Sequence, residues 1–330
     1  MLTLGIETSC DETSIALLRD TSIVVNEIYT QTIHSEYGGV VPEMASRAHI
    51  NKIDKLCSHV FTQAQITPCD IDLIAVTDQP GLAGALLVGI SFALGFHTGY
   101  KTAITGVNHL EGHIFSALLE HPDLPFPFLG MVISGGHSAI YKVEKGGVYT
   151  CLGHTVDDAA GEAFDKTGKM LGFAYPAGRS IGEAAEIYAV SGDNKPIAFP
   201  IARINTGRLD FSFSGLKTAV KYFIDGKDAA WIAQERPRIC YSFQTTIIES
   251  LLTNLALAVQ QTGIRDIAIV GGVACNLELR KQALARFGTA ARFPSPRLCT
   301  DNAAMIARAG YAVFADNRCR RPSMNPSSAF

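Results

Sequence analysis

The stretch TLGIETSCDETSIALL (residues 3–18) decides the fold. Thr3–Glu7 and Ser14–Leu18 are short runs of the apolar and β-branched residues that are typical of strands. The segment between them, Thr8–Thr13, is polar. A polar loop between two β-like runs predicts a hairpin at the amino terminus.

The same plan recurs later in the chain. Phe128–Ile133 and Ala139–Val143 are apolar runs on either side of the loop Ser134–Ser138. Two more strand-like runs, Leu73–Thr77 and Ile267–Val270, each lead into a glycine-containing turn and a helix-like segment. Strands that alternate with helices predict an α/β fold, and the recurrence of the plan indicates a duplicated architecture.

The length and composition fit two globular domains. The chain has 330 residues, of which 47% are hydrophobic, and domains of about 150 residues are the usual expectation for such a chain. Pro122–Pro127 contains three prolines in six residues, which stop a helix, and it is the expected boundary. The tail Arg318–Phe330 holds three arginines and two prolines and is expected to fray.

Composition also narrows the function. A net charge of −3 argues against a generally basic nucleic-acid-binding surface, so any such contact must use local patches or a partner. The eight cysteines include no Cys-x-x-Cys pair, which disfavours a cysteine zinc site or a redox motif. Met1–Ile6 lacks the basic region of a secretory signal. The apolar run Gly81–Phe96 falls short of the ~20 residues of a membrane span. We therefore expect a buried helix there and a cytoplasmic protein.

Asn108–His113 contains two histidines four residues apart. On a helix this spacing puts both imidazoles on one face, where they can bind one metal ion. Asp301 is the best candidate for a third ligand, and two imidazoles with one carboxylate suit iron(II) or zinc with positions left open. The spacing alone fits ordinary surface or core histidines equally well. A zinc peptidase helix needs Glu directly after the first His, and Leu110 stands there.

Glycine-containing loops follow several of the expected strands. Ser134–Ser138 and Gly271–Gly272 could offer backbone N–H groups to a phosphate, whereas the Gly-x-Gly-x-x-Gly and P-loop patterns are absent. Asn276 could bind a base or ribose, or could simply cap a helix. Asp11 and Glu12 in the first loop could act as a base near the phosphate, or belong to an ordinary polar turn.

An acidic stretch follows the second hairpin. It contains Asp157, Asp158, Glu162 and Asp165, with lysines close behind. Taken alone, it is expected to be a solvated face.

Together the motifs resemble the bacterial tRNA N6-adenosine threonylcarbamoyltransferase family (TsaD). The resemblance covers nearly the whole chain in colinear order. The segments that carry it are Gly5–Thr13, Tyr37–Glu43, Ala45–Arg47, Asn108–His113, Ser134–His137, Asp157–Lys166, Leu209–Lys217, Gly271–Asn276 and Cys299–Asn302.

The resemblance implies an actin/Hsp70-like (ASKHA) fold, with two duplicated α/β lobes around a central cleft for ligand and metal. The lobes would span 1–124 and 125–330, with a family-specific helical insertion at about 151–240 and a C-terminal segment packing back on the first lobe. It also implies a reaction. The threonylcarbamoyl group of threonylcarbamoyl-AMP passes to N6 of the adenosine 3′ of the anticodon (position 37), in tRNAs reading codons that begin with adenine, and AMP leaves.

Site residues follow position by position. His109, His113 and Asp301 resemble the family's metal ligands for one Fe²⁺ or Zn²⁺ ion, and Asp11 and Glu12 are our candidates for the catalytic group. The resemblance also implies adenylate contacts, which together with the glycine loop make up the expected substrate site: Ile133, Ser134, Gly135, Gly136, His137, Asp165, Gly178, Gly271, Gly272 and Asn276. Gln79 and Ala177 depart from the family pattern, each standing where the family has glycine.

The implied partners are tRNA, a smaller paralogue of similar fold (TsaB-like) and an ATPase (TsaE-like), without a membrane. Three other functions are weighed against this. A metallopeptidase (O-sialoglycoprotein endopeptidase) needs the glutamate that Leu110 replaces. An actin-like ATPase or sugar kinase needs Mg²⁺ ligation in place of a histidine pair. A non-catalytic scaffold does not account for the polar loops.

Overall fold

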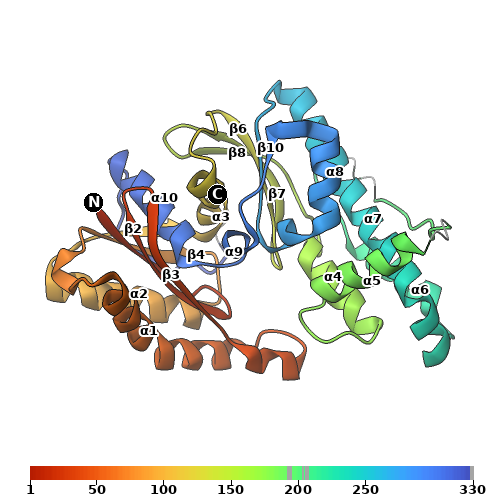
Figure 1. The fold of residues 1–330 in the computed structure, drawn as a ribbon, viewed down its shortest axis with the longest axis horizontal. Coiled ribbons are helices and arrows are strands. Elements are labelled where there is room, and N and C mark those ends of the chain that lie inside the picture. The colour runs from red at the N-terminus through yellow and green to blue at the C-terminus, as the bar shows by residue number, and fades with distance from the viewer. Residues whose placement is uncertain (192–194, 203, 205–207, 328–330) are drawn as a thin grey trace. The chain divides into compact units, whose positions relative to one another are not determined.

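The computed structural model describes residues 1–191, 195–202, 204 and 208–327, and the chain divides into two compact units (Figure 1). The first unit contains Met1–Leu124, Lys145–Val148 and Pro294–Phe330, and the second contains Pro125–Glu144 and Tyr149–Phe293. The chain leaves the first unit within the proline-rich segment, returns to it briefly at Lys145–Val148, and returns again at Pro294. The end of the expected 125–330 lobe therefore belongs to the first unit.

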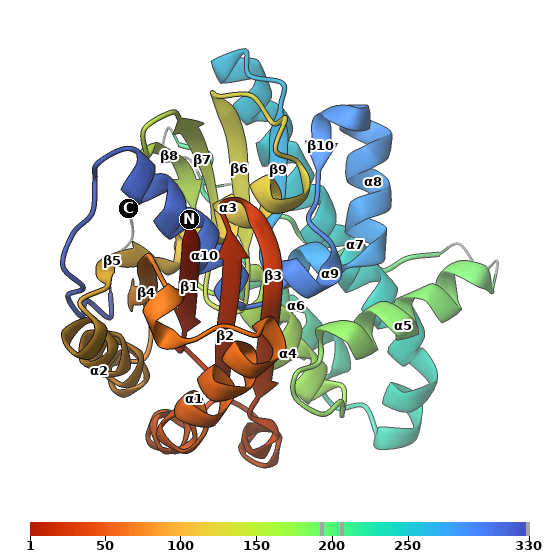
Figure 2. The same ribbon diagram turned by 60° about the vertical axis from the view of Figure 1, so that its left-hand side comes forward.

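The first unit is built on a five-stranded sheet with the order β3-β2-β1-β4-β5 (Figure 2). β1, β2 and β3 form an antiparallel meander, which confirms the hairpin predicted from residues 3–18. β4 runs parallel to β1, and β5 runs parallel to β4. The carboxyl ends of β1, β4 and β5 therefore lie at the same edge of the sheet. The strands are β1 (Leu2–Glu7), β2 (Glu12–Arg19), β3 (Ser22–Thr30), β4 (Leu73–Gln79) and β5 (Ala103–Asn108).

Helices cover both faces of this sheet. Alternate residues of a strand point to opposite faces. Ile15 and Leu17 accordingly pack with α1 (Pro42–Ala64) and α2 (Ala83–Tyr100), whereas Ala16 and Leu18 pack with α10 (Ala303–Ala315). Because α10 covers the second face, the end of the chain is part of the first unit. The other helical elements are η1 (Thr32–Tyr37), η2 (Pro68–Asp70), α3 (His109–Glu120) and α9 (Pro296–Cys299).

α2 is the helix expected from the apolar run at residues 81–96. It is buried along one face only, since Leu86 and Ile90 lie in the core while Leu87 is exposed. Its 18 residues are long and apolar enough to cross a membrane by length and composition. A single such helix is a weak indication, because the core helices of many proteins pass the same test.

The second unit repeats the plan of the first. Its sheet has the order β8-β7-β6-β9-β10, in which each strand corresponds to one in β3-β2-β1-β4-β5. β6 and β7 form the predicted antiparallel hairpin, β9 is parallel to β6, and β10 is parallel to β9. The predicted duplication is thus visible in the strand order. The strands are β6 (Phe128–Ile133), β7 (Ser138–Glu144), β8 (Val148–His154), β9 (Ile267–Val270) and β10 (Ala291–Arg292).

Helices separate β8 from β9, and the acidic stretch fastens two of them together. Asp157 accepts hydrogen bonds from the backbone N–H groups of Phe213 and Ser214 at the start of α6. Asp158 binds Lys166 at 2.7 Å and Lys217 at 2.6 Å. The expectation of a solvated face is therefore wrong for Asp158, which is buried, whereas Asp157 is exposed. The helical elements are α4 (Ala160–Met170), α5 (Gly178–Val190), α6 (Ser214–Ile224), α7 (Ala229–Thr262), η3 (Gly272–Cys275), α8 (Leu277–Phe287) and η4 (Gly288–Ala290).

Residues 318–327 of the C-terminal tail are held in place where we expected fraying, and residues 328–330 lie outside the described part of the chain. The guanidinium of Arg320 binds both carboxylate oxygens of Asp78, at 2.5 and 2.6 Å, and Asp78 is fully buried at the end of β4. Gly106 donates its backbone N–H to the carbonyl of Arg320 at 3.1 Å, and Gly81 donates to the carbonyl of Pro326 at 3.2 Å. A Cβ at Gly106 would lie 2.1 Å from Asp78 Oδ2, so only glycine leaves room for this pair.

Candidate functional site

The two predicted histidines lie on the first turns of α3, directly after β5. Asn108 caps this helix, since its side chain accepts a hydrogen bond from the backbone N–H of Leu110 at 2.8 Å. One turn separates His109 from His113, and their ring centroids are 4.6 Å apart. Asp301, just before α10, places Oδ1 3.4 Å from His109 Nε2 and 3.2 Å from His113 Nε2. The structure brings the three candidate ligands together.

These side chains fit a metal ion. One ligand atom from each lies within 4.8 Å of the others. His113 is fully buried, and neither of its ring nitrogens has a hydrogen-bond partner among the described residues, because Asp301 at 3.2 Å lacks hydrogen-bond geometry. A buried polar atom without a partner is unfavourable, and a cation between the three residues would provide one. Two imidazoles and a carboxylate suit Fe²⁺ or Zn²⁺.

The charges of the cluster depend on one another. Burial lowers the pKa of His113, so its imidazole is held in the neutral form that binds metals. Burial also acts to lower the pKa of His109, but the charges of Asp301 and Glu7 outweigh it and raise that pKa well above its usual range. Burial acts to raise the pKa of Asp301, and the positive charge of His109 lowers it further than burial raises it.

Glu7 contacts this cluster, and the sequence did not point to it. Its carboxylate is fully buried at the end of β1, and Oε2 lies 3.1 Å from His109 Nδ1. Thr77 donates its hydroxyl to the same oxygen at 2.5 Å, and Ser9 donates its backbone N–H to Oε1 at 2.5 Å. The contact arises because β1, β4 and β5 are parallel neighbours in the sheet, and this pairing cannot be read from the amino-acid sequence.

Asp11 lies in the β1–β2 turn and Glu12 begins β2, in the same unit as the histidines. Burial, together with the charges of Asp301 and Asp11, raises the pKa of Glu12 well above its usual range. His49 of α1, a second residue that the sequence did not indicate, supports this turn. Its Nε2 donates to the carbonyl of Cys10 at 2.9 Å, which leaves Nδ1 to accept from the Thr13 hydroxyl at 2.8 Å.

The predicted phosphate loop joins β6 to β7 in the second unit. Ser134 N–H donates to the carbonyl of His137 at 2.8 Å, and His137 N–H donates to the Ser134 hydroxyl at 3.2 Å, so the turn closes on itself. Gly135 and Gly136 at its tip are exposed. Ile133 is buried in the core and can contribute only backbone atoms to a ligand. The loop is a preorganised turn with accessible backbone.

Gly271 lies against Ile133, directly before this loop, and Gly272 begins η3. Gly271 has a φ of +94°, which residues other than glycine rarely adopt, and a Cβ there would lie 2.5 Å from the carbonyl oxygen of Ile133. Both the backbone conformation and the lack of space therefore require glycine at this position. Asn276, five residues on, caps α8 by accepting from Leu279 N–H at 2.9 Å.

Asn276 is also held by Gln244 of α7, which the sequence analysis missed. The Asn276 side-chain amide donates to Gln244 Oε1 at 2.7 Å, and Gln244 is buried. The structure therefore gives Asn276 the helix-capping role and leaves one of its N–H bonds for another partner.

Asp165 lies within α4, and Gly178 is the first residue of α5. Asp165 accepts a hydrogen bond from Ala177 N–H at 2.8 Å. Ala177, one of the departures from the family pattern, is buried, and Gly168 makes room for its methyl group. The other departure, Gln79, ends β4 opposite Asn108 at an irregularity of the sheet.

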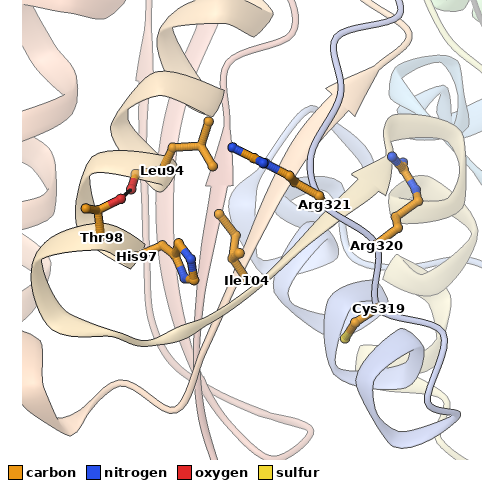
Figure 3. Close-up of a pocket in the computed structure, with 7 residues that line it drawn as sticks. All are labelled: Leu94, His97, Thr98, Ile104, Cys319, Arg320 and Arg321. Atoms are coloured by element: carbon orange, nitrogen blue, oxygen red, sulfur yellow. Dashed lines mark hydrogen bonds between the residues drawn. The ribbon is translucent and has the colours of Figure 1, made fainter.

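A cavity of about 460 Å³ lies elsewhere in the first unit (Figure 3). In Figure 3, Arg321 reaches towards Leu94, whereas Arg320 points to the other side of the tail. None of the predicted site residues lines it. The lining residues are Leu94, His97, Thr98, Ile104, Cys319, Arg320 and Arg321.

Comparisons with known folds bear on the architecture. The chain superposes on HypF from T. kodakarensis with a TM-score of 0.62 and 12% identity, covering 97% of this chain and 48% of that one. It superposes on component A of the Acidaminococcus fermentans (R)-2-hydroxyglutaryl-CoA dehydratase with a TM-score of 0.57 and 17% identity, covering 96% and 98%. These are actin-like proteins, and the predicted actin/Hsp70-like fold is confirmed.

Comparisons of sequence identify the family. A family model described as tRNA N6-adenosine threonylcarbamoyltransferase matches residues 22–308. Relatives of that name are 46% identical in Geobacter sp. (strain M21), over 94% of this chain and 90% of the relative, and 41% identical in Chlamydia muridarum, over 95% and 93%. The residues matched by the family model and by these relatives include both units. The chain therefore belongs to the tRNA N6-adenosine threonylcarbamoyltransferase family.

Proposed function

We propose that this protein transfers the threonylcarbamoyl group from threonylcarbamoyl-AMP to N6 of adenosine 37 in tRNAs that read codons beginning with adenine. AMP is the leaving group. The observation that carries the proposal is the cluster of two buried histidines, His109 and His113, with the half-buried Asp301 in a chain of this family. The metallopeptidase alternative is not favoured, because Leu110 points no carboxylate at a metal-bound water.

The reaction needs an activated donor because the exocyclic amine of adenine is a weak nucleophile. A carbamoyl–phosphate mixed anhydride provides that activation, since AMP is a good leaving group. We assign the donor phosphate to the turn at 134–137, whose exposed Gly135 and Gly136 can direct backbone N–H groups at phosphate oxygens. Ile133, His137, Asp165 and Gly178 complete the proposed adenylate contacts. Gly271, Gly272 and Asn276 would bind the nucleoside.

We assign one divalent ion to His109, His113 and Asp301, with Fe²⁺ as the first choice and Zn²⁺ as the second. When bound, such an ion supplies positive charge that orients the donor and neutralises charge developing on it. His113 is suited to this role because it is buried and neutral, and Asp301 because it is ionised. The chain itself holds both side chains in place through α3 and α10.

The amine must lose a proton as the new bond forms. We propose Asp11 or Glu12 for that step, because Asp11 ends the β1–β2 turn and Glu12 begins β2, where the charge of Asp301 acts on it. The raised pKa of Glu12 makes its carboxylate a stronger base than an ordinary glutamate once it is ionised.

We further propose that the protein works in the cytoplasm with a smaller paralogue of similar fold (TsaB-like) and an ATPase (TsaE-like). The net charge of −3 supports a need for partners, because tRNA binding draws on concentrated positive charge. If partners complete the tRNA site, mixing them should raise the affinity for tRNA, and added salt should lower it.

The test is a reconstitution with threonylcarbamoyl-AMP and unmodified tRNA, followed by mass spectrometry of the nucleosides. Threonylcarbamoyladenosine should form with wild-type protein plus partners, and His113→Ala should abolish it. His59→Ala, which changes a histidine on α1 outside the cluster, serves as the matched control and should retain activity. No modified nucleoside from the complete mixture would refute the transferase function. Multiple turnovers by this chain alone would refute the need for partners.

A further inference from the structure

We propose that Glu7 is a positioning residue that fixes the tautomer of His109 for metal binding. The inference rests on the metal site assigned above and concerns a residue outside the ligand set. Nothing in the proposed reaction requires Glu7 to touch substrate. Its role would be to present His109 Nε2 to the ion with a free lone pair.

The sheet brings Glu7 to His109. Ile6 of β1 pairs with Val76 of β4, so Glu7 and Thr77 stand next to each other at the ends of these strands. Thr77 pairs with Val107 of β5, and β5 runs directly into His109. Three parallel strands therefore deliver the carboxylate, the hydroxyl and the imidazole to one place.

The hydrogen bonds around Glu7 determine which nitrogen of His109 carries the proton. Glu7 Oε1 accepts from Ser9 N–H, and Oε2 accepts from the Thr77 hydroxyl. Because both carboxylate oxygens act as acceptors, the His109 nitrogen 3.1 Å from Oε2 is the donor in this contact. That nitrogen is Nδ1. In the neutral ring Nε2 then has the lone pair, and Nε2 is the atom that lies 3.4 Å from Asp301 Oδ1.

The surroundings of Glu7 favour its role as an acceptor. Its carboxylate is fully buried, and both of its oxygens accept hydrogen bonds, from the Ser9 N–H and the Thr77 hydroxyl. A carboxylate hydrogen-bonded to the far nitrogen of a metal-binding histidine also makes the ring a better ligand. The Ser9 hydroxyl, 3.2 Å from Nδ1, is a neutral neighbour and cannot replace this charge.

Glu7→Gln is the informative substitution because it keeps size and shape. The amide turns one acceptor into a donor. If the new amide nitrogen takes the position of Oε2, it donates to His109 Nδ1, and His109 must then carry its proton on Nε2, the metal-binding atom. If the amide nitrogen takes the position of Oε1, it faces the Ser9 N–H, and two N–H donors meet in a buried place. Either arrangement should weaken metal binding about 10- to 100-fold.

The experiment measures Zn²⁺ affinity by competition with a chromophoric chelator, in proteins shown to be folded by circular dichroism. Wild type and Glu7→Gln are compared with Glu111→Gln, which neutralises another buried carboxylate, on α3 and 3.9 Å from Arg318. We expect a 10- to 100-fold loss for Glu7→Gln and less than a threefold loss for Glu111→Gln. Equal affinities for wild type and Glu7→Gln, or equal losses in the two variants, would overturn the proposal.

A second measurement does not depend on the variant folding. In ¹⁵N-labelled, Zn²⁺-loaded wild-type protein, the His109 ring should show a proton on Nδ1 that exchanges slowly with water and a metal-shifted Nε2. Metal on Nδ1, or a rapidly exchanging Nδ1 proton, would refute the role of Glu7. Wild-type protein that binds no Zn²⁺ would instead refute the metal site, and transferase activity measured separately would show whether the proposed function stands.

Discussion

Arg320 of the C-terminal tail and Asp78 at the end of β4 form a bidentate ion pair, with two hydrogen bonds between the guanidinium and the carboxylate. Asp78 has no exposed surface, and two backbone N–H groups of the tail also donate to it: Ser323 to the carboxylate at 2.9 Å and Asn325 to the backbone carbonyl at 3.0 Å. The tail therefore provides the positive charge and the hydrogen bonds that stabilise a carboxylate buried in the first unit.

We expect Arg320→Ala to destabilise the first unit by about 3 kcal/mol, because it leaves a buried charge without its partner. Urea unfolding followed by circular dichroism measures the change. Arg321→Ala, at the adjacent exposed position, should change stability by about 0.5 kcal/mol or less. Equal effects from the two arginines would contradict a specific role for the pair.

His113→Ala should remove the metal. The substitution deletes one of three ligands from a buried site, and elemental analysis of purified protein should find metal at well below one ion per chain. His59→Ala should retain wild-type occupancy, since this histidine is exposed on α1 and bonds to Gln63. Full occupancy in the His113 variant would exclude it as a ligand.

Asn276→Ala should weaken binding of an adenine nucleotide, measured by calorimetry, by about tenfold, the equivalent of a single lost hydrogen bond. It should also remove the α8 cap and destabilise the protein by about 1 kcal/mol. Asp228→Ala removes the corresponding cap of α7 and separates the two effects. It should reduce stability to a similar extent while nucleotide affinity stays unchanged. Unaltered affinity in Asn276→Ala would remove this residue from the site.

Asp158 should make stability depend on pH. Burial acts to raise the pKa of this carboxyl group, but hydrogen bonds from Lys166 and Lys217 lower it below its usual value. Because the folded pKa is the lower one, the stabilisation is fully present above the unfolded pKa of about 4 and is lost as the pH falls through the folded value.

The corresponding substitution is Asp158→Asn. It should lower the free energy of unfolding by about 1–3 kcal/mol at pH 7, and the difference from wild type should shrink below pH 4. Glu183→Gln, which breaks an exposed pair with Arg179, is the control and should have an effect of about 0.5 kcal/mol or less. A pH-independent difference for Asp158→Asn would show that its charge is not the cause.

Local patterns carried most of what the sequence could predict. The hairpins at residues 3–18 and 128–143 follow from short β-like runs around polar turns, and the histidine spacing needs only one helix. Asp301 is different. The sequence around it shows only an acidic residue near the start of a late helix. No local rule links it to histidines so far away in the chain, and the family resemblance was needed to connect them.

The contacts that the sequence did not reveal depend on tertiary neighbours. Glu7 looks like the end of a strand until β1, β4 and β5 are known to be parallel. The Arg320 tail looks like a frayed end until a buried Asp78 is found beneath it. Asn276 shows the opposite case, in which the simple capping role foreseen from its position is observed directly.

The first unit is assembled from both ends of the chain, and this affects how it folds during translation. His109 and His113 leave the ribosome long before Asp301 and α10, because the whole second unit is synthesised between them. At about 5–20 residues per second the interval lasts on the order of 10–40 seconds. Throughout that time the nascent sheet lacks the helix that covers one of its faces. A chaperone should therefore associate with ribosome-bound chains that end before residue 294 and release chains that have been completed.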